Sequence, residues 1–253
     1  MKKILLPFTF ILLPFILFSQ DIHFSQYYQA PLMINPSLTG VFNGDMRAGI
    51  SYKDQWKSVA GTNPVYRTYS LSFDAGLLKK KWENSYLGAG LYIFSDKAGD
   101  TKMGTTQINL LLSSIIVVAE GHQVSLGAQG GYAQRSINLS DPGLRWESQF
   151  QNEVYTQNIS SGEPSSFESY SYPDFSAGVA WNYGSEETSI FKSNPFRANA
   201  AVSYQHLNQP KQQYYISEKL NSKIIANGGL FIGMSNTNTA LVPSIIYIQN
   251  GSL

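Results

Sequence analysis

QVSLGAQGGYAQ, residues 123–134, is the stretch that decides the fold of this chain. Val124, Leu126 and Tyr132 lie on one face of an extended strand, whereas Ser125 and its alternate neighbours lie on the other, because successive side chains of a β-strand point to opposite sides. The first face is apolar, and the second consists of small and polar residues. The stretch therefore predicts a β-strand that has one apolar face.

The same alternation recurs along the chain and predicts nine strands in all. Besides residues 123–134, it is clear in four segments: Met46–Lys53, Thr68–Asp74, Asp174–Tyr183 and Arg197–Gln205. It is weaker in four more: Ser85–Phe94, Met103–Val118, Lys223–Gly233 and Ala240–Ile248.

The composition bears on what the apolar faces contact. Charged residues make up 14% of the chain, against about 25% in an ordinary soluble domain, and aromatic residues make up 13%. The mean hydropathy of −0.17 excludes a helical membrane protein. We expect an antiparallel transmembrane β-barrel, because its apolar outside and polar inside average to such values. The alternative is a soluble β-sandwich, in which the apolar faces would form a core.

The first nineteen residues predict export. Lys2 and Lys3 precede an uncharged apolar run, Ile4–Phe18, and Ser19 offers a small residue for cleavage. This is the pattern of a signal peptide (residues 1–19), and the run is too short to span a membrane as a helix. The chain has no cysteine, which excludes disulfides, thiolate metal sites and a lipid-modified N-terminal cysteine. Its formal net charge of +1 gives no indication of nucleic-acid binding.

Residues 20–43 differ from the strands that follow. Pro31 and Pro36 exclude one regular strand or helix across this segment. Two compatible interpretations remain open. The segment could pack against the barrel, either as a plug inside it or along its periplasmic rim. It could also be a docking element for a partner. Residues 44–253 are expected to form the barrel. Because bacterial single-chain barrels have an even number of strands, a count of nine means either that one strand is miscounted or that the sequence lacks its last strands, and we favour the second.

The sequence gives little support to catalysis. His23, His122 and His206 stand in unrelated contexts, and no orienting partner is evident for any of them. No cluster of residues has metal-ligand spacing, and no cofactor motif is present. We therefore expect a protein that is not an enzyme and that has no catalytic, cofactor-binding or metal site. A passive porin or solute channel and an outer-membrane lipase are kept as alternatives.

Several motifs give the chain an identity. Phe24-Ser25-Gln26-Tyr27, Asn35-Pro36, Gly40 and Tyr52-Lys53-Asp54-Gln55-Trp56 resemble the N-terminal pattern of the PorP/SprF family of the type IX secretion system of Bacteroidetes. Residues 173–178 and 203–210 are similar to two further signatures of that family. Eight residues carry the N-terminal resemblance and are candidates for contact with a partner: Phe24, Gln26, Tyr27, Asn35, Pro36, Gly40, Gln55 and Trp56.

The resemblance implies a non-enzymatic β-barrel of the cell outer membrane that takes part in protein secretion and gliding motility. It implies contacts with periplasmic ring or peptidoglycan-linked secretion components and with outer-membrane lipid. It also implies a role in the export or surface attachment of a large adhesin that bears a type B C-terminal signal.

Overall fold

The computed structural model describes residues 29–55, 66–79, 81, 84–139, 143–151, 153–162, 169–184, 196–213, 217–234 and 239–251. The predicted signal peptide, Phe24, Gln26, Tyr27 and Trp56 lie outside these residues. Two short helices, α1 (Pro31–Ile34) and η2 (Pro36–Leu38), precede the strands, and a third, η3 (Glu147–Gln149), lies in a connection. The long strands are β1 (Met46–Gln55), β2 (Tyr66–Leu77), β3 (Ser85–Ala98), β4 (Met103–Ala119), β5 (His122–Ser136), β8 (Tyr170–Gly184), β9 (Phe196–Gln205), β12 (Lys223–Gly233) and β14 (Ser244–Asn250). The short strands are β6 (Phe150–Gln151), β7 (Val154–Tyr155), β10 (Lys211–Gln213), β11 (Ser217–Lys219) and β13 (Ala240–Leu241).

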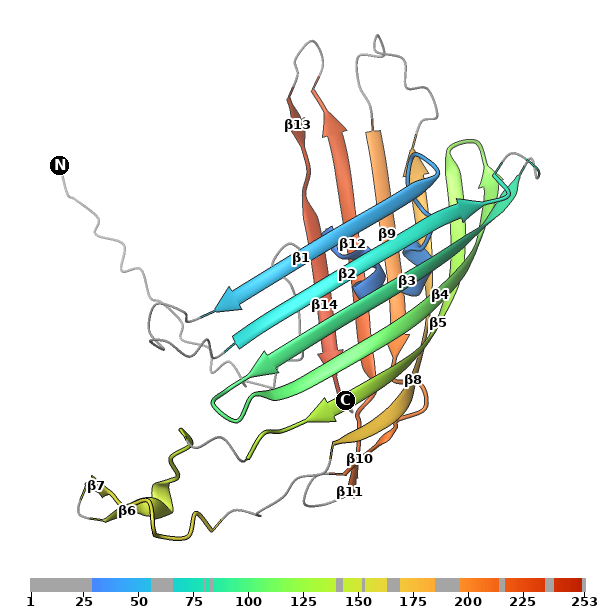
Figure 1. Cartoon of the computed structure of the whole chain (residues 1–253). Coiled ribbons are helices and arrows are strands. Elements are labelled where there is room, and N and C mark those ends of the chain that lie inside the picture. Colours follow the sequence, from blue (N-terminus) through green and yellow to red (C-terminus); the bar gives the residue numbers. More distant parts are fainter. Residues whose placement is uncertain are drawn as a thin grey trace, which may run out of the picture.

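The long strands form one antiparallel sheet in chain order, β1-β2-β3-β4-β5-β8-β9-β12, and both β13 and β14 pair with β12. Figure 1 shows that this sheet is strongly curled into a half-barrel. Within the described residues, β1 and β14 each pair on one side only. The prediction of an all-β, antiparallel, barrel-like fold is therefore confirmed.

All nine predicted strands are present, and most extend beyond their predicted bounds. The last one, predicted as Ala240–Ile248, is divided into β13 and β14 by Val242 and Pro243, since a proline cannot donate a ladder hydrogen bond. Two small hairpins, β6–β7 and β10–β11, lie in connections where no strand was predicted.

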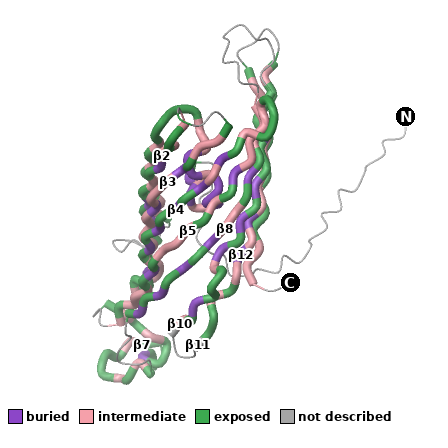
Figure 2. The backbone as a smooth tube through the Cα atoms, turned by 90° about the vertical axis from the view of Figure 1, so that its right-hand side faces the viewer, coloured by how far each residue is buried: buried purple, intermediate pink, exposed green. Residues whose placement is uncertain are grey.

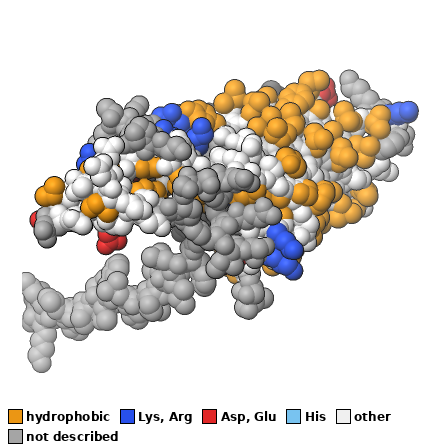
Figure 3. Space-filling model, turned by 60° about the horizontal axis from the view of Figure 1, so that its bottom comes forward, with side chains coloured by type: hydrophobic (Ala, Val, Ile, Leu, Met, Phe, Trp, Pro, Cys, Tyr) orange, Lys and Arg blue, Asp and Glu red, His pale blue; other side chains and the backbone are white. Residues whose placement is uncertain are grey.

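The apolar faces of the strands lie on the outside of the curled sheet. In β4 the outward Leu110 and Leu112 are 67% and 66% exposed, whereas the inward Leu111 and Ser113 are 1% and 5% exposed. Figure 3 shows apolar side chains gathered over the outer surface of the strands. A soluble sandwich would bury such a face in its core, so the sandwich interpretation is wrong.

No helix among the described residues has the length and apolar character needed to cross a membrane.

The concave face is covered by residues 30–44, which we call the inner segment; it is drawn in blue in Figure 1. Each of its helices begins at a proline, Pro31 for α1 and Pro36 for η2, where the missing N–H costs nothing. Between the helices, Asn35 is extended, which separates them into two turns. Buried residues are concentrated where this segment lies between the two walls of the sheet (Figure 2).

Candidate functional site

A line of small residues crosses the concave face beneath the inner segment. The residues stand directly opposite one another on successive strands and come from β2, β3, β4, β5, β8 and β9. We call them the small-residue belt: Gly76, Gly88, Ser113, Gly127, Gly178 and Ser203.

The belt is small at Gly88 and Gly127 because the backbone of the inner segment touches it there, and at Gly178 because the Asn35 side chain does. A Cβ atom on Gly88 would lie 2.2 Å from the carbonyl oxygen of Thr39, and one on Gly127 would lie 2.3 Å from the carbonyl carbon of Pro36. A Cβ atom on Gly178 would lie 2.1 Å from Oδ1 of Asn35. Glycine therefore permits a close approach that any larger residue would prevent.

Side chains of the sheet donate hydrogen bonds to backbone carbonyls of the inner segment. Oγ of Ser113 donates to the Thr39 carbonyl at 2.6 Å, and Oγ of Ser203 donates to the Ile34 carbonyl at 2.6 Å. Nε2 of Gln205 donates to the carbonyls of Met33, at 3.0 Å, and Ile34, at 3.2 Å. The sheet thus recognises the course of this backbone and not only its side chains.

Asn35 fixes the bend between the two short helices. Its Oδ1 accepts hydrogen bonds from the backbone N–H of Ser37, at 2.9 Å, and from the Ser37 hydroxyl, at 2.6 Å. Its Nδ2 donates to the carbonyl of Val179 in β8 at 3.3 Å. Asn35 is fully buried, so this one side chain both caps η2 and joins it to the sheet.

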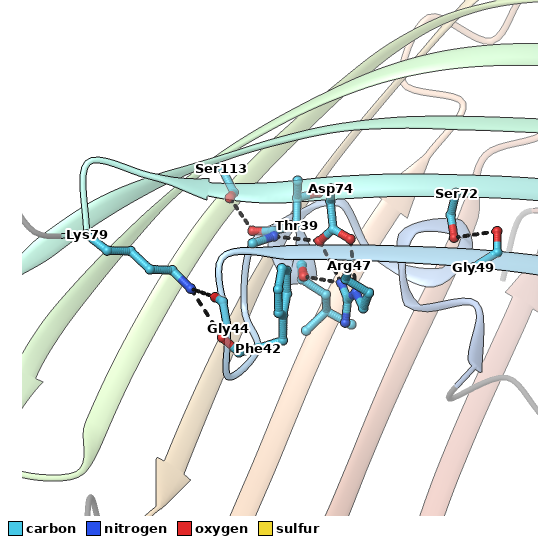
Figure 4. Close-up of polar contacts among 11 residues, drawn as sticks. Thr39, Phe42, Gly44, Arg47, Gly49, Ser72, Asp74, Lys79 and Ser113 are labelled. Carbon is cyan, nitrogen blue, oxygen red and sulfur yellow. Dashed lines mark hydrogen bonds and ion pairs between the residues drawn. The ribbon is translucent and has the colours of Figure 1, made fainter.

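Asp74 holds the end of the inner segment where the chain enters β1 (Figure 4). Its carboxylate accepts a hydrogen bond from the N–H of Gly40 at 2.8 Å and two from Arg47, from Nε at 2.9 Å and Nη2 at 2.7 Å. Nη2 of Arg47 also donates to the Leu38 carbonyl at 3.1 Å. Gly40 adopts a φ of +73°, which favours glycine at this position. We call Asp74, Arg47 and Gly40 the latch.

Two cations flank the ring of Phe42 just beyond the latch. Cζ of Arg47 lies 4.6 Å and Nζ of Lys79 lies 5.0 Å from the ring centre. Lys79 also donates to the carbonyls of Phe42, at 3.3 Å, and Gly44, at 2.5 Å. Partial burial lowers the pKa of Lys79, while Asp45 and Asp74 oppose that shift.

A second polar cluster joins β8 to the connection that follows β9. Oδ1 of Asp174 lies 2.9 Å from Nδ1 of His206, and its Oδ2 accepts a hydrogen bond from Nε2 of Gln107 at 3.0 Å. Nδ2 of Asn208 donates to the Pro173 carbonyl at 2.7 Å. The segments 173–178 and 203–210, recognised separately in the sequence, are therefore in direct contact.

The family model of the type IX secretion system membrane protein PorP/SprF matches residues 16–252, nearly the whole chain. This chain belongs to the PorP/SprF family. No curated protein matches it. The resemblance predicted from the N-terminal motifs is confirmed, and the chain is a membrane component of the type IX secretion system.

Among the residues predicted for this PorP/SprF site, Asn35, Pro36 and Gly40 lie together in the inner segment. Gln55 lies apart from them. It is the last residue of β1 and stands opposite Tyr66, two residues beyond the predicted end of this strand at Lys53.

Sequence reasoning missed the partners of these residues, although several stand in the quoted motifs. Asp174, Gln205 and His206 lie in the segments 173–178 and 203–210, and Asp74 ends the predicted strand Thr68–Asp74. His206 has a carboxylate partner that the sequence did not reveal. In the described part of the chain, however, no hydroxyl is hydrogen-bonded to His206, and no three His, Asp or Glu side chains could hold a metal ion.

Proposed function

We propose that this PorP/SprF protein is a non-enzymatic β-barrel of the bacterial outer membrane that supports the export or surface attachment of large adhesins, as in gliding motility. The observation that carries the proposal is the family match over residues 16–252. The apolar outer face of the curled sheet agrees with it. The client would be an adhesin that bears a type B C-terminal signal. Periplasmic ring or peptidoglycan-linked components of the secretion system would bind at the inner end.

The dimensions of the strands support a position across the membrane. A tilted strand needs about 9–11 residues to cross the hydrocarbon core. β1 has 10 residues, β4 has 17 and β5 has 15, so each is long enough to span it. The outward residues of these strands, such as Ile50, Leu110 and Leu126, are exposed apolar side chains suited to lipid contact.

The position of the inner segment favours a plugged barrel and not an open porin. It is bound on the concave face by β2, β4, β8 and β9 through Asp74, Ser113, Val179 and Ser203. A diffusion channel needs an unobstructed polar interior. We therefore propose that residues 20–43 act as a plug, which disfavours the porin alternative.

The connections at the two ends of the strands differ, which suggests an orientation. The connection between β5 and β8 carries the β6–β7 hairpin, whereas β4 and β5 are joined through Glu120 and Gly121 only. Outer-membrane barrels have long loops outside and short turns in the periplasm. We propose that the β6–β7 hairpin faces outward, where an exported protein can reach it.

The first experiment places the protein and its two ends. We expect the protein in the outer-membrane fraction, as a species whose gel mobility changes on heating. An epitope inserted after Gln157, in the outer connection, is expected to bind antibody on intact cells. The matched epitope after Glu120 is expected to bind only after permeabilisation. Recovery in the soluble periplasm, or the reverse epitope pattern, would refute the proposal.

The second experiment tests the role in secretion. Deletion of the gene is expected to reduce surface-bound adhesin while leaving the adhesin itself synthesised. Affinity purification of the tagged protein is expected to recover periplasmic secretion components together with the adhesin. Unchanged surface adhesin, or conductance typical of an open porin in planar bilayers, would instead favour the solute-channel alternative. Lipid hydrolysis lost on His206→Ala substitution would favour the lipase alternative.

A further inference from the structure

A cavity of about 640 Å³ lies on the concave face, at the end of the sheet that carries the β4–β5 turn. Val41, Phe42 and Asn43 of the inner segment form one side of it, and the ends of β3, β4, β5, β8 and β9 form the other. Ligand sites in proteins commonly have volumes of about 300–1,000 Å³. The cavity is therefore large enough for a ligand several residues long.

Three side-chain amides form a row across this cavity. Gln123 stands opposite Asn182, and Asn182 stands opposite Asn199, so the three come from neighbouring strands at one level. Adjacent strands lie about 4.8 Å apart, so the row spans about 10 Å, the length of about three extended residues. Nδ2 of Asn182 is buried and has no hydrogen-bond partner in the described part of the chain.

Each amide presents both a donor and an acceptor, as does each peptide unit of an extended chain. Phe42 and Tyr86 add aromatic surfaces to the lining, against which apolar side chains can pack.

The charge on the described cavity lining comes from one residue, Arg197. Its Cζ lies 5.6 Å from the ring centre of Phe231, which orients the guanidinium, and it forms no ion pair with any described residue. A guanidinium binds a carboxylate through two parallel hydrogen bonds. The described lining includes no Asp or Glu that would repel such a ligand.

We propose that this cavity binds an extended peptide, with the row of Gln123, Asn182 and Asn199 pairing with its backbone and Arg197 binding its terminal carboxylate. A neutral glycan could use the amides and the aromatic rings, but it would leave the guanidinium without a partner. The inference goes beyond the role in secretion and does not depend on which end of the barrel faces the periplasm. It can therefore fail while the proposed function stands, and the reverse also holds.

The experiment uses the full chain folded in detergent micelles and a labelled probe, fluorescein-Gly-Ser-Ala-Ala-Ala. The probe is used with a free carboxylate and, as its matched form, with a C-terminal amide. Fluorescence polarisation is expected to show that the carboxylate form binds at least tenfold more tightly. Equal affinity of the two forms, or no binding of either, would overturn the proposal without any variant. Tighter binding of chitotetraose than of the carboxylate peptide would overturn it in favour of a glycan site.

Variants then assign the roles of the two kinds of residue. Arg197→Gln is expected to remove the preference for the carboxylate form, and Asn182→Leu to weaken both forms about tenfold. Arg145→Gln, at the distant β6–β7 hairpin, is the matched control and is expected to bind as the parent does. A change in gel mobility on heating checks that each variant folds. If Arg197→Gln misfolds, Arg197→Lys replaces it, because lysine keeps the positive charge but lacks the paired N–H donors of the guanidinium. An Arg197 variant that folds and keeps the full carboxylate preference would contradict the assignment.

Discussion

Gly127→Ala is the sharpest test of the contact between the sheet and the inner segment. The added methyl group would lie 2.3 Å from both the Pro36 carbonyl carbon and the Ser37 nitrogen, where an ordinary contact needs 3.4 Å or more. The inner segment must therefore retreat by about 1 Å, since the overlap involves backbone atoms and not a flexible side chain. Such a retreat also lengthens hydrogen bonds such as that from Asn35 to the Val179 carbonyl, now 3.3 Å.

We expect Gly127→Ala to lower the free energy of unfolding by about 2–4 kcal/mol, from overpacking of about 1–3 kcal/mol and about 1 kcal/mol for each hydrogen bond lost. The matched control is Gly130→Ala in the same strand, facing outward. Its methyl group would lie 3.4 Å from the Phe175 ring, an ordinary contact. Replacing a strand glycine there is expected to be neutral or to stabilise by about 0.5–1 kcal/mol.

Two assays follow the change. Denaturant unfolding in micelles gives the free energy, and maleimide labelling of Thr39→Cys reports displacement of the inner segment. Thr39 is fully buried and the native chain has no cysteine, so the reporter is expected to react only when the segment has moved. Equal unfolding free energies and equal labelling rates for the two alanine variants would refute the contact as described.

Three further predictions concern other parts of the molecule. Asp74→Asn is expected to destabilise the fold by about 1–3 kcal/mol and to speed labelling at the inner segment, because the carboxylate charge opposite Arg47 is lost and the new amide nitrogen cannot accept a hydrogen bond. Unchanged unfolding would contradict the latch. Asn208→Ala is expected to cost about 1–2 kcal/mol and to increase proteolysis in the connection after β9, and protection equal to the parent's would argue against the contact with Pro173. Leu110→Arg is expected to lower the stability in lipid vesicles by about 2–4 kcal/mol, because it places a charge on the outer face of β4. The control Glu120→Lys, in the turn, is expected to leave the stability unchanged. Equal stability of the two variants would exclude lipid contact for β4.

The strands could be predicted from the sequence because each has one apolar face that meets the period-2 test without knowledge of its neighbours. The shortest strands could not, since β6 and β7 have 2 residues each and leave no periodicity to detect. The break before β14 depends on Pro243, which a count of alternating residues does not register. Strand ends were predicted too short because polar residues such as Asp96, still paired in β3, resemble loop residues.

The candidate site was predicted only in part. Asn35, Pro36 and Gly40 are marked residue types in one segment and could be singled out, whereas their partners depend on register and curl. Gly127 and Gly178 look like ordinary strand glycines until the pairing places them opposite each other beneath the inner segment. The contact between Asp174 and His206 likewise needs β8 and β9 to be neighbours.

The small-residue belt has a consequence for the order of folding. The inner segment precedes every strand that the structure describes, yet its partners are contributed by strands as late as β9, and Gln205 bonds Met33 across 172 residues. Contacts of such long range form slowly, since the loop must close before they give any stability. Glycines in strands also weaken a sheet that has nothing packed against them. The inner segment is thus expected to take its final position last, in one cooperative step with the strands around it. Assembly in the membrane is then complete only after that step.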